Sequence, residues 1–192
     1  MHTSSGIPAN RICGNRTIRN YFMTSAHVII TAIALTGCVS DLRTRRIPNY
    51  LTFGGAMLGI VYALVTSGWS AAAVSAAGWT VGLVLFIPFF LLRGLGGGDV
   101  KLLAALGAWF GPAGMLVLAF YTAVAGGVMA LVVVLFTGYF STAFKNLWFL
   151  LCHWRVTGLK ALPDISLDNP HSHRLPYGVA IAAGAVTTLW LH

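Results

Sequence analysis

Long apolar stretches without a charged residue alternate with short polar segments along the chain. An unpaired charge at the centre of a bilayer costs about 2.5–3.5 kcal/mol on insertion scales, so charge-free runs predict transmembrane helices. Each crossing of a hydrocarbon core about 30 Å thick needs roughly 20 such residues. The pattern therefore predicts an all-α integral membrane bundle of about six transmembrane helices, at residues 21–39, 50–67, 69–92, 100–111, 113–136 and 177–192.

The longest uncharged run, residues 102–144, is too long for one crossing. A helix of that length would measure about 64 Å at a rise of 1.5 Å per residue, which is enough to cross twice. Gly111 and Pro112 favour a turn, so we expect the chain to bend there. The fourth span is then short, and a short span tilts or thins the bilayer.

Three segments are expected to lie outside the spans. Residues 139–155 mix aromatic with basic side chains, which is typical of an interfacial helix, and residues 161–176 contain three prolines and predict a loop. Residues 1–22 form an N-terminal tail ahead of the membrane domain, residues 23–192. Because Met23 directly precedes the first apolar run, we predict that translation starts there.

Composition supports a membrane protein and excludes most other classes. Hydrophobic residues make up 57% and charged residues 8% of the 192 residues, whereas soluble domains have roughly 25% charged residues. The net charge of +8 comes from basic residues scattered in short loops, which is typical of charges that orient spans and not of a nucleic-acid-binding surface. The loops after spans one, three and five contain basic residues, for example Arg43, Arg45 and Arg46 after span one. The positive-inside rule therefore predicts that these loops face the cytoplasm.

The residues predict no metal site and no cofactor. The three cysteines are far apart and form no CxxC pair. Acids and histidines between residues 164 and 173 lie among prolines and polar residues, which favours a solvated loop over a metal cluster. A zinc protease motif HExxH would require glutamate, and the GxSG motif of serine rhomboids is absent from the sequence.

Carboxylates are scarce, and two of them occupy related positions. The chain has no glutamate, and its aspartates are Asp41, Asp99, Asp164 and Asp168. Asp41 follows the first predicted span and Asp99 follows the third, so two crossings separate them and both are expected at the cytoplasmic ends of helices. Acidic residues at membrane depth are costly and usually mark function.

The pair predicts acid–base chemistry. Two aspartates close enough to share a proton cannot both ionise easily, so one can stay protonated while the other acts as a base toward water, as in aspartic proteolysis. Gly96, Gly97 and Gly98 precede Asp99 and are expected to allow positive φ and close approach of a substrate backbone. The alternative is that the glycines only make a turn and Asp99 caps the following helix.

Three short motifs resemble those of the type IV prepilin peptidases, a family of intramembrane aspartyl proteases. Residues 96–99 (GGGD) resemble the GxGD signature, and residues 98–103 (GDVKLL) are similar to its form in prepilin peptidases. Residues 41–52 (DLRTRRIPNYLT) are similar to the other aspartate motif of the family. Residues 176–180 (PYGVA) resemble the proline-glycine motif that opens the last span. The resemblance covers about residues 23–192.

The resemblance implies that Asp41 and Asp99 are the catalytic pair. The residues that it assigns to an active-site loop are Gly96, Gly97, Gly98 and Lys101. Those that it assigns to a supporting motif are Ile47, Pro48, Asn49, Pro176, Tyr177 and Gly178. The implied activity, which needs no cofactor, is cleavage of the leader of prepilins or pseudopilins at the cytoplasmic face of the bacterial inner membrane, in pilus assembly or type II-like secretion. Larger members also have an N-terminal methyltransferase region, often with paired CxxC motifs, whereas this chain is similar to the short peptidase-only form of tight-adherence pili.

Some interpretations stay open at this point. Lys101 could lie beside Asp99 and stabilise its negative charge, or extend to the membrane interface. Pro48 is expected to start the second span, with Asn49 near the cap. A small transporter or channel would place acids near mid-span and show an internal repeat, and a non-enzymatic component of a pilus assembly would need no catalysis.

Overall fold

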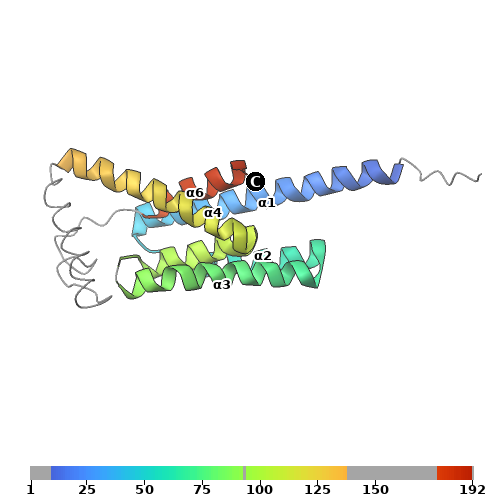
Figure 1. Ribbon diagram of the computed structural model, residues 1–192, viewed down its shortest axis with the longest axis horizontal. Coiled ribbons are helices and arrows are strands. Elements are labelled where there is room, and N and C mark those ends of the chain that lie inside the picture. The colour runs from blue at the N-terminus through green and yellow to red at the C-terminus, as the bar shows by residue number, and fades with distance from the viewer. Residues whose placement is uncertain (1–9, 93, 138–176, 192) are drawn as a thin grey trace, which may run out of the picture.

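The protein is an all-helical bundle, which confirms the predicted fold class. The computed structural model describes residues 10–92, 94–137 and 177–191. All regular secondary structure within these ranges is helical. Figure 1 shows their arrangement. The elements are α1 (Asn10–Thr44), α2 (Asn49–Ser67), α3 (Trp69–Leu91), α4 (Gly97–Thr137) and α6 (Tyr177–Leu191).

The bend predicted at Gly111 is present and divides α4 into two halves. Gly111 has φ 71° and ψ 179°, which is not a helical conformation, and Pro112 follows it. Glycine adopts positive φ without a steric penalty, and proline cannot donate the hydrogen bond that would continue the first half of the helix. Figure 1 shows the two halves diverging from this bend as a V, so that the chain turns back. With α1, α2, α3 and α6, the two halves account for the six predicted helical segments.

The bounds of α1 differ from the prediction at both ends. The helix starts at Asn10 instead of residue 21 and continues through Asp41 to Thr44. Charged residues are tolerated in a helix that extends past the hydrocarbon, so the charge-free run underestimates the length of the helix. The interfacial helix predicted at 139–155 and the loop predicted at 161–176 lie outside the described residues.

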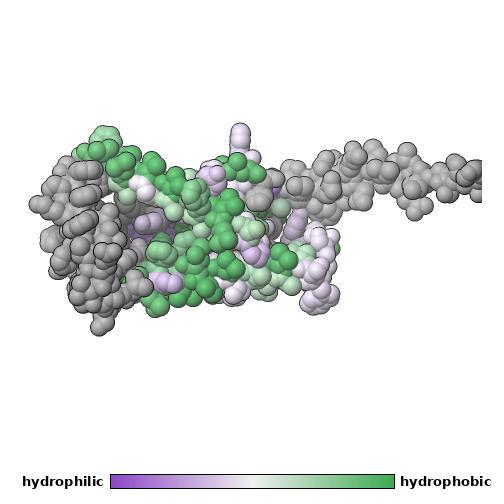
Figure 2. Space-filling model, in the orientation of Figure 1, coloured by the Kyte–Doolittle hydropathy of each residue, from purple (hydrophilic) through white to green (hydrophobic). Residues whose placement is uncertain are grey.

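The outer surface of the bundle is apolar, as a lipid environment requires. Within the described residues, four helical segments are long and apolar enough to cross a membrane, and the fifteen-residue α6 is a shorter apolar helix. Large hydrophobic side chains are exposed on several helices, for example Val65 on α2, Val84 on α3 and Phe120 on α4. Figure 2 shows hydrophobic residues over most of the described surface in that view. The chain is therefore a multi-pass membrane protein.

The first half of α4 forms the centre of the bundle. Helices α2, α3, α6 and the end of α1 pack against α4. Its side chains between residues 102 and 106 are almost completely buried, with exposed fractions of 1% or less. Because Asp99 is only three residues before Leu102, the most tightly packed part of the molecule fixes the position of this aspartate.

Glycines allow α3 and α4 to approach closely. A Cβ added to Gly78 would overlap the carbonyl oxygen of Gly107 and lie 2.7 Å from the Cα of Gly111. The Ser75 hydroxyl of α3 donates a 2.6 Å hydrogen bond to the carbonyl oxygen of Ala108 in α4. Lipid tails are as apolar as the helix surface, so packing and such hydrogen bonds, and not the hydrophobic effect, hold helices together in a bilayer.

We expect Gly78→Ala to destabilise the bundle, because the atoms that the new Cβ would meet belong to the backbone of α4 and cannot rotate away. Overpacking of this kind costs about 1–3 kcal/mol. The control is Gly54→Ala in α2, where an added Cβ meets nothing within 4 Å. Thermal unfolding in detergent, followed by circular dichroism, should show a lower midpoint for Gly78→Ala and an unchanged or higher midpoint for Gly54→Ala. Equal midpoints would contradict the packing described here.

Candidate functional site

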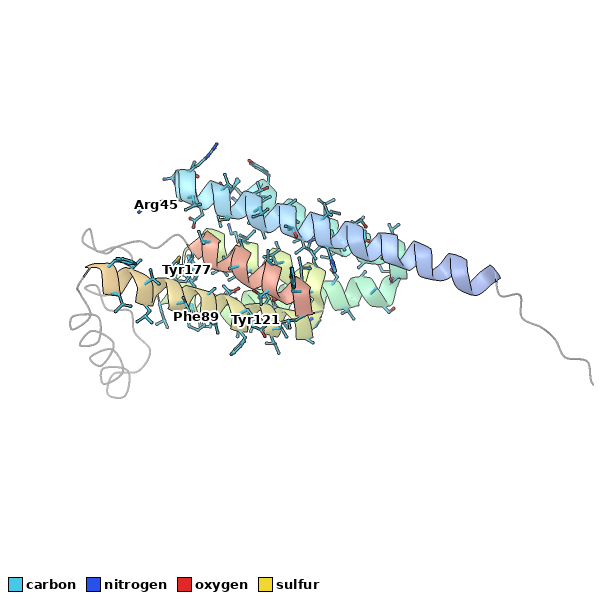
Figure 3. All side chains as sticks on the ribbon, turned by 90° about the horizontal axis from the view of Figure 1, so that it is seen from above. Arg45, Phe89, Tyr121 and Tyr177 are labelled. Atoms are coloured by element: carbon cyan, nitrogen blue, oxygen red, sulfur yellow. The ribbon has the colours of Figure 1, made fainter. Side chains whose placement is uncertain are left out.

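Asp41, Asp99 and the first turn of α6 meet at one end of the bundle. Asp41 lies in the last turn of α1, and Asp99 is the third residue of α4. Both aspartates are buried, each with an exposed fraction of 9%. Figure 3 shows Arg45, just beyond α1, and Tyr177, the first residue of α6, at this same end. The prediction that the two acids belong at one end of the helices agrees with this placement.

Asp41 is held by the backbone of α6. The Gly178 amide donates a buried 2.8 Å hydrogen bond to Oδ2 of Asp41. Gly178 is the second residue of α6, so its amide is one of the N-terminal groups that have no partner within the helix. A Cβ on Gly178 would lie 2.8 Å from Cβ of Asp41 and 3.2 Å from the Cα of Cys38, which leaves no room for a side chain. Gly178 is therefore required for α6 to reach Asp41.

Asp99 is also buried, but its carboxyl group lacks a full set of hydrogen-bond partners. Among the residues that the structure describes, its Oδ1 has no hydrogen-bond partner. The backbone of Gly96 donates a hydrogen bond to the Asp99 carboxyl, and a Cβ added at Gly96 would lie 2.9 Å from Oδ2. The charge of Asp41 acts on Asp99, and the charge of Asp99 acts on Tyr177. Tyr177 and Gly178 thus connect the first turn of α6 to both aspartates.

The three glycines before Asp99 do not have the conformation expected from the sequence. Glycines with positive φ in the described chain are Gly68 and Gly111, so the prediction of positive φ at Gly96, Gly97 and Gly98 was wrong. Gly97 and Gly98 already belong to the first turn of α4. They lie against neighbouring side chains: a Cβ would come within 3.2 Å of the Phe90 ring at Gly97 and within 3.0 Å of Cβ of Ile47 at Gly98. Close packing at the start of α4 therefore leaves no space for a side chain at Gly97 or Gly98.

The connection between α1 and α2 is fixed by hydrogen bonds that the sequence did not predict. Arg45 ends α1 with φ 52°, a left-handed conformation that often terminates helices, and its amide donates to the carbonyl oxygen of Asp41. The hydroxyls of Ser40 and Thr44 both donate to the carbonyl oxygen of Arg46, at 2.8 and 3.0 Å. Serine and threonine side chains near a helix end commonly form hydrogen bonds with nearby backbone groups. The presence of Ser40 and Thr44 at the end of α1 could therefore have predicted these bonds.

Ile47 connects this turn to the start of α4. Its side chain is 9% exposed, belongs to the main hydrophobic core, and faces Gly98. Pro48 then has an extended conformation, with φ −69° and ψ 140°, and is the N-cap of α2. The second helix was predicted to start at Pro48 with Asn49 near the cap; it does start here, but Pro48 is the cap and Asn49 is the first helical residue. The motif residues after Asp41 thus place the end of α1 beside the glycines that precede Asp99.

The described Lys101 side chain contacts α2, not Asp99. Its ammonium donates a 3.0 Å hydrogen bond to Oδ1 of Asn49 and lies 5.6 Å from the centre of the Phe53 ring. The Asn49 bond is exposed, so its contribution to stability is modest. Lys101, the fifth residue of α4, thus links α4 to Asn49, the first residue of α2. Pro176, the remaining predicted site residue, lies outside the described residues.

The arrangement suits acid–base chemistry. Two buried carboxyl groups interact, and each has a hydrogen bond from a backbone amide, that of Gly178 for Asp41 and that of Gly96 for Asp99. Within the described part of the chain, no group of three or more His, Cys, Asp or Glu side chains could hold a metal ion. The site residues therefore resemble a carboxylate pair that exchanges protons with water and a bound carbonyl compound.

Comparison with known proteins identifies relatives. Residues 28–131 match the type IV leader peptidase family, a range that includes both Asp41 and Asp99. A Neisseria gonorrhoeae protein named prepilin leader peptidase/N-methyltransferase is 33% identical over 118 residues, which are 58% of this chain and 41% of that protein. The chain therefore matches less than half of that relative's length. No solved structure matches the chain significantly.

We expect Gly178→Ala to push α6 away from α1 and to expose Cys38, because the new Cβ would lie against the Cys38 backbone. Overpacking should also lower stability by about 1–3 kcal/mol. The measurement is the rate of maleimide alkylation of Cys38 in a chain whose Cys13 and Cys152 are serines. The rate should rise in Gly178→Ala and stay unchanged in Gly127→Ala, since a Cβ on Gly127 meets nothing within 4 Å. An unchanged rate in both variants would refute the tight contact at Gly178.

Proposed function

Since the chain belongs to the type IV leader peptidase family, we propose that it is an aspartic endopeptidase that removes the leader peptide of prepilins or pseudopilins. The observation that best supports the aspartic mechanism is the meeting of Asp41 and Asp99 at one end of the bundle, where both are buried and interact electrostatically. Acids buried in a membrane bundle are costly and usually mark function. The name of the Neisseria gonorrhoeae relative, prepilin leader peptidase/N-methyltransferase, supports the choice of substrate.

The proposed reaction is hydrolysis of a peptide bond without a cofactor. One ionised aspartate removes a proton from water, and the water oxygen attacks the scissile carbonyl carbon. The other aspartate, which is protonated, donates its proton to the carbonyl oxygen. When the tetrahedral intermediate collapses, the first aspartate protonates the leaving amine and the second recovers its proton from the diol. Low polarity around buried carboxylates strengthens each of these interactions.

We place this reaction at the cytoplasmic face of the bacterial inner membrane. The segments 42–46 and 93–101 next to the two aspartates contain Arg43, Arg45, Arg46, Arg93 and Lys101, and basic loops remain on the cytoplasmic side. A prepilin whose hydrophobic helix enters the bilayer would then present its leader junction at the depth of the two aspartates. We assign this activity to residues 23–192, and the translation start at Met23 stays a prediction.

Replacement of either aspartate should abolish leader cleavage. Asp41→Asn removes one ionisable group and Asp99→Asn the other, and general acid–base catalysis contributes roughly 10²- to 10⁴-fold in rate. The chain is co-expressed with a candidate prepilin from its own genome, and the leader is followed by gel shift and mass. Wild type and Asp168→Asn, an aspartate outside the proposed pair, should cleave, whereas the two site variants should not.

The possible outcomes separate the alternatives. Cleavage by both Asn variants, at normal membrane levels, would show that the catalytic pair is wrong. If the wild type cleaves no local prepilin, a small transporter, a channel or a non-enzymatic pilus assembly component becomes the better explanation. The position of both acids near helix ends, and not at mid-span, argues against the transporter.

The peptidase activity is proposed without N-methylation of the product. The CxxC pairs associated with the methyltransferase region do not occur in this sequence. We therefore expect the new N-terminal amine of the cleaved pilin to be free when this chain is the added enzyme. Mass spectrometry of the mature N-terminal peptide checks this prediction. A methylated product from a host that has no other prepilin peptidase would contradict it.

A further inference from the structure

The two aspartates have unequal surroundings. Oδ2 of Asp41 accepts a buried hydrogen bond from the Gly178 amide. Oδ1 of Asp99 is buried and has no partner among the described residues. Both residues are buried, with 9% of each exposed. The Asp99 carboxyl also has a backbone hydrogen bond, from Gly96, so the difference between the two acids lies in the second, unpartnered oxygen of Asp99.

The Gly178 amide is a suitable partner for a carboxylate at Asp41. A carboxylate that accepts a backbone N–H bond makes a charge-assisted hydrogen bond, roughly twice as strong as a neutral one. The donor is also in the first turn of α6, where the helix dipole gives a partial positive charge.

The surroundings of Asp99 favour its protonated form. A charge buried without a full set of partners costs far more than a neutral group, and the negative charge of Asp41 acts on the same carboxyl. The amides of Asp99 and Val100 both donate to the carbonyl oxygen of Gly96, and the Gly96 backbone donates to the Asp99 carboxyl but leaves Oδ1 without a partner among the described residues. Lys101, the nearest cation along α4, donates to Asn49. Tyr177 is a further neighbour, and its neutral hydroxyl offers no positive charge.

We propose that Asp99 holds the proton in the resting enzyme, that Asp41 is the ionised base, and that the Gly178 amide is the positioning group that fixes this order. The catalytic roles rest on the proposed function. In the reaction, Asp41 takes a proton from water while Asp99 gives its proton to the scissile carbonyl oxygen. As the C–N bond breaks, Asp41 protonates the amine and Asp99 takes a proton back from the diol, so both groups return to their starting states.

Infrared spectroscopy can test the position of the proton directly, because the chain has no glutamate. We would use a background in which Asp164 and Asp168 are asparagines, which leaves Asp41 and Asp99 as the side-chain carboxyls. Spectra of the purified protein in detergent are recorded at about pH 6, where an ordinary aspartate, with a pKa of about 3.9, is ionised. The band of a protonated carboxyl group should be present in this background.

The proposal predicts an asymmetric response to the two site variants. The band should disappear when Asp99→Asn is added and persist when Asp41→Asn is added. The reverse pattern would overturn the assignment, and so would a band that is absent from the background protein. Loss or retention of the band in both variants would also overturn it, because the proton would then not belong to Asp99 alone.

A second measurement avoids the site variants, in case one of them fails to fold. Carbodiimides react with protonated carboxyl groups, and the adduct can be located by mass spectrometry in the wild-type chain. Asp99 should be modified in preference to Asp41, and preferential modification of Asp41 would contradict the proposal. Neither experiment depends on a substrate. Failure of prepilin cleavage would therefore reject the proposed function, whereas these two experiments would still show which aspartate holds the proton.

Discussion

The hydrogen bond from the Gly178 amide to Asp41 is the interaction on which the candidate site depends. It joins the first turn of α6 to the last turn of α1 across 137 residues of sequence. The bond forms only because residue 178 has no side chain, since a Cβ would overlap Asp41. The same approach brings Tyr177 within electrostatic reach of Asp99. One helix terminus thereby connects both acids.

The rigidity of the site comes from small residues in the helices around α4. Gly78 and Gly82 of α3 lie directly against α4, because a Cβ on either would meet α4 backbone at less than 3 Å. On the other side, Trp109 of α4 packs over Gly59 and donates a 2.9 Å hydrogen bond to the carbonyl oxygen of Gly55 in α2. Close packing and hydrogen bonds replace the hydrophobic effect between helices in lipid. The start of α4, and Asp99 with it, is therefore held from two sides.

Much of the fold could be predicted because charge and hydropathy directly reflect the cost of crossing a bilayer. The absence of charge between residues 102 and 144 required a bend, and glycine followed by proline placed it at Gly111, as the structure shows. Counting crossings also placed Asp41 and Asp99 at the same end. The extent of α1 was underestimated, since helices continue beyond the hydrocarbon and charge marks only the boundary of the apolar part.

The site itself was predicted less completely, because its details depend on contacts between distant segments. Three consecutive glycines suggested freedom of φ, yet Gly97 and Gly98 are helical, and it is Phe90 and Ile47 that leave no space for side chains. The partner of Lys101 could not be identified from sequence, since Asn49 is 52 residues away.

The same reasoning applies to the chemistry. Two aspartates are identical as residue types, and sequence alone leaves their roles interchangeable. Their difference arises from contacts between distant segments, in particular from a backbone amide of α6, a group that every residue except proline possesses. The amide acquires a role only because α6 begins where α1 ends, so that an unpaired donor meets a buried carboxylate. The order of the two acids is therefore a property of helix packing at the end of the bundle.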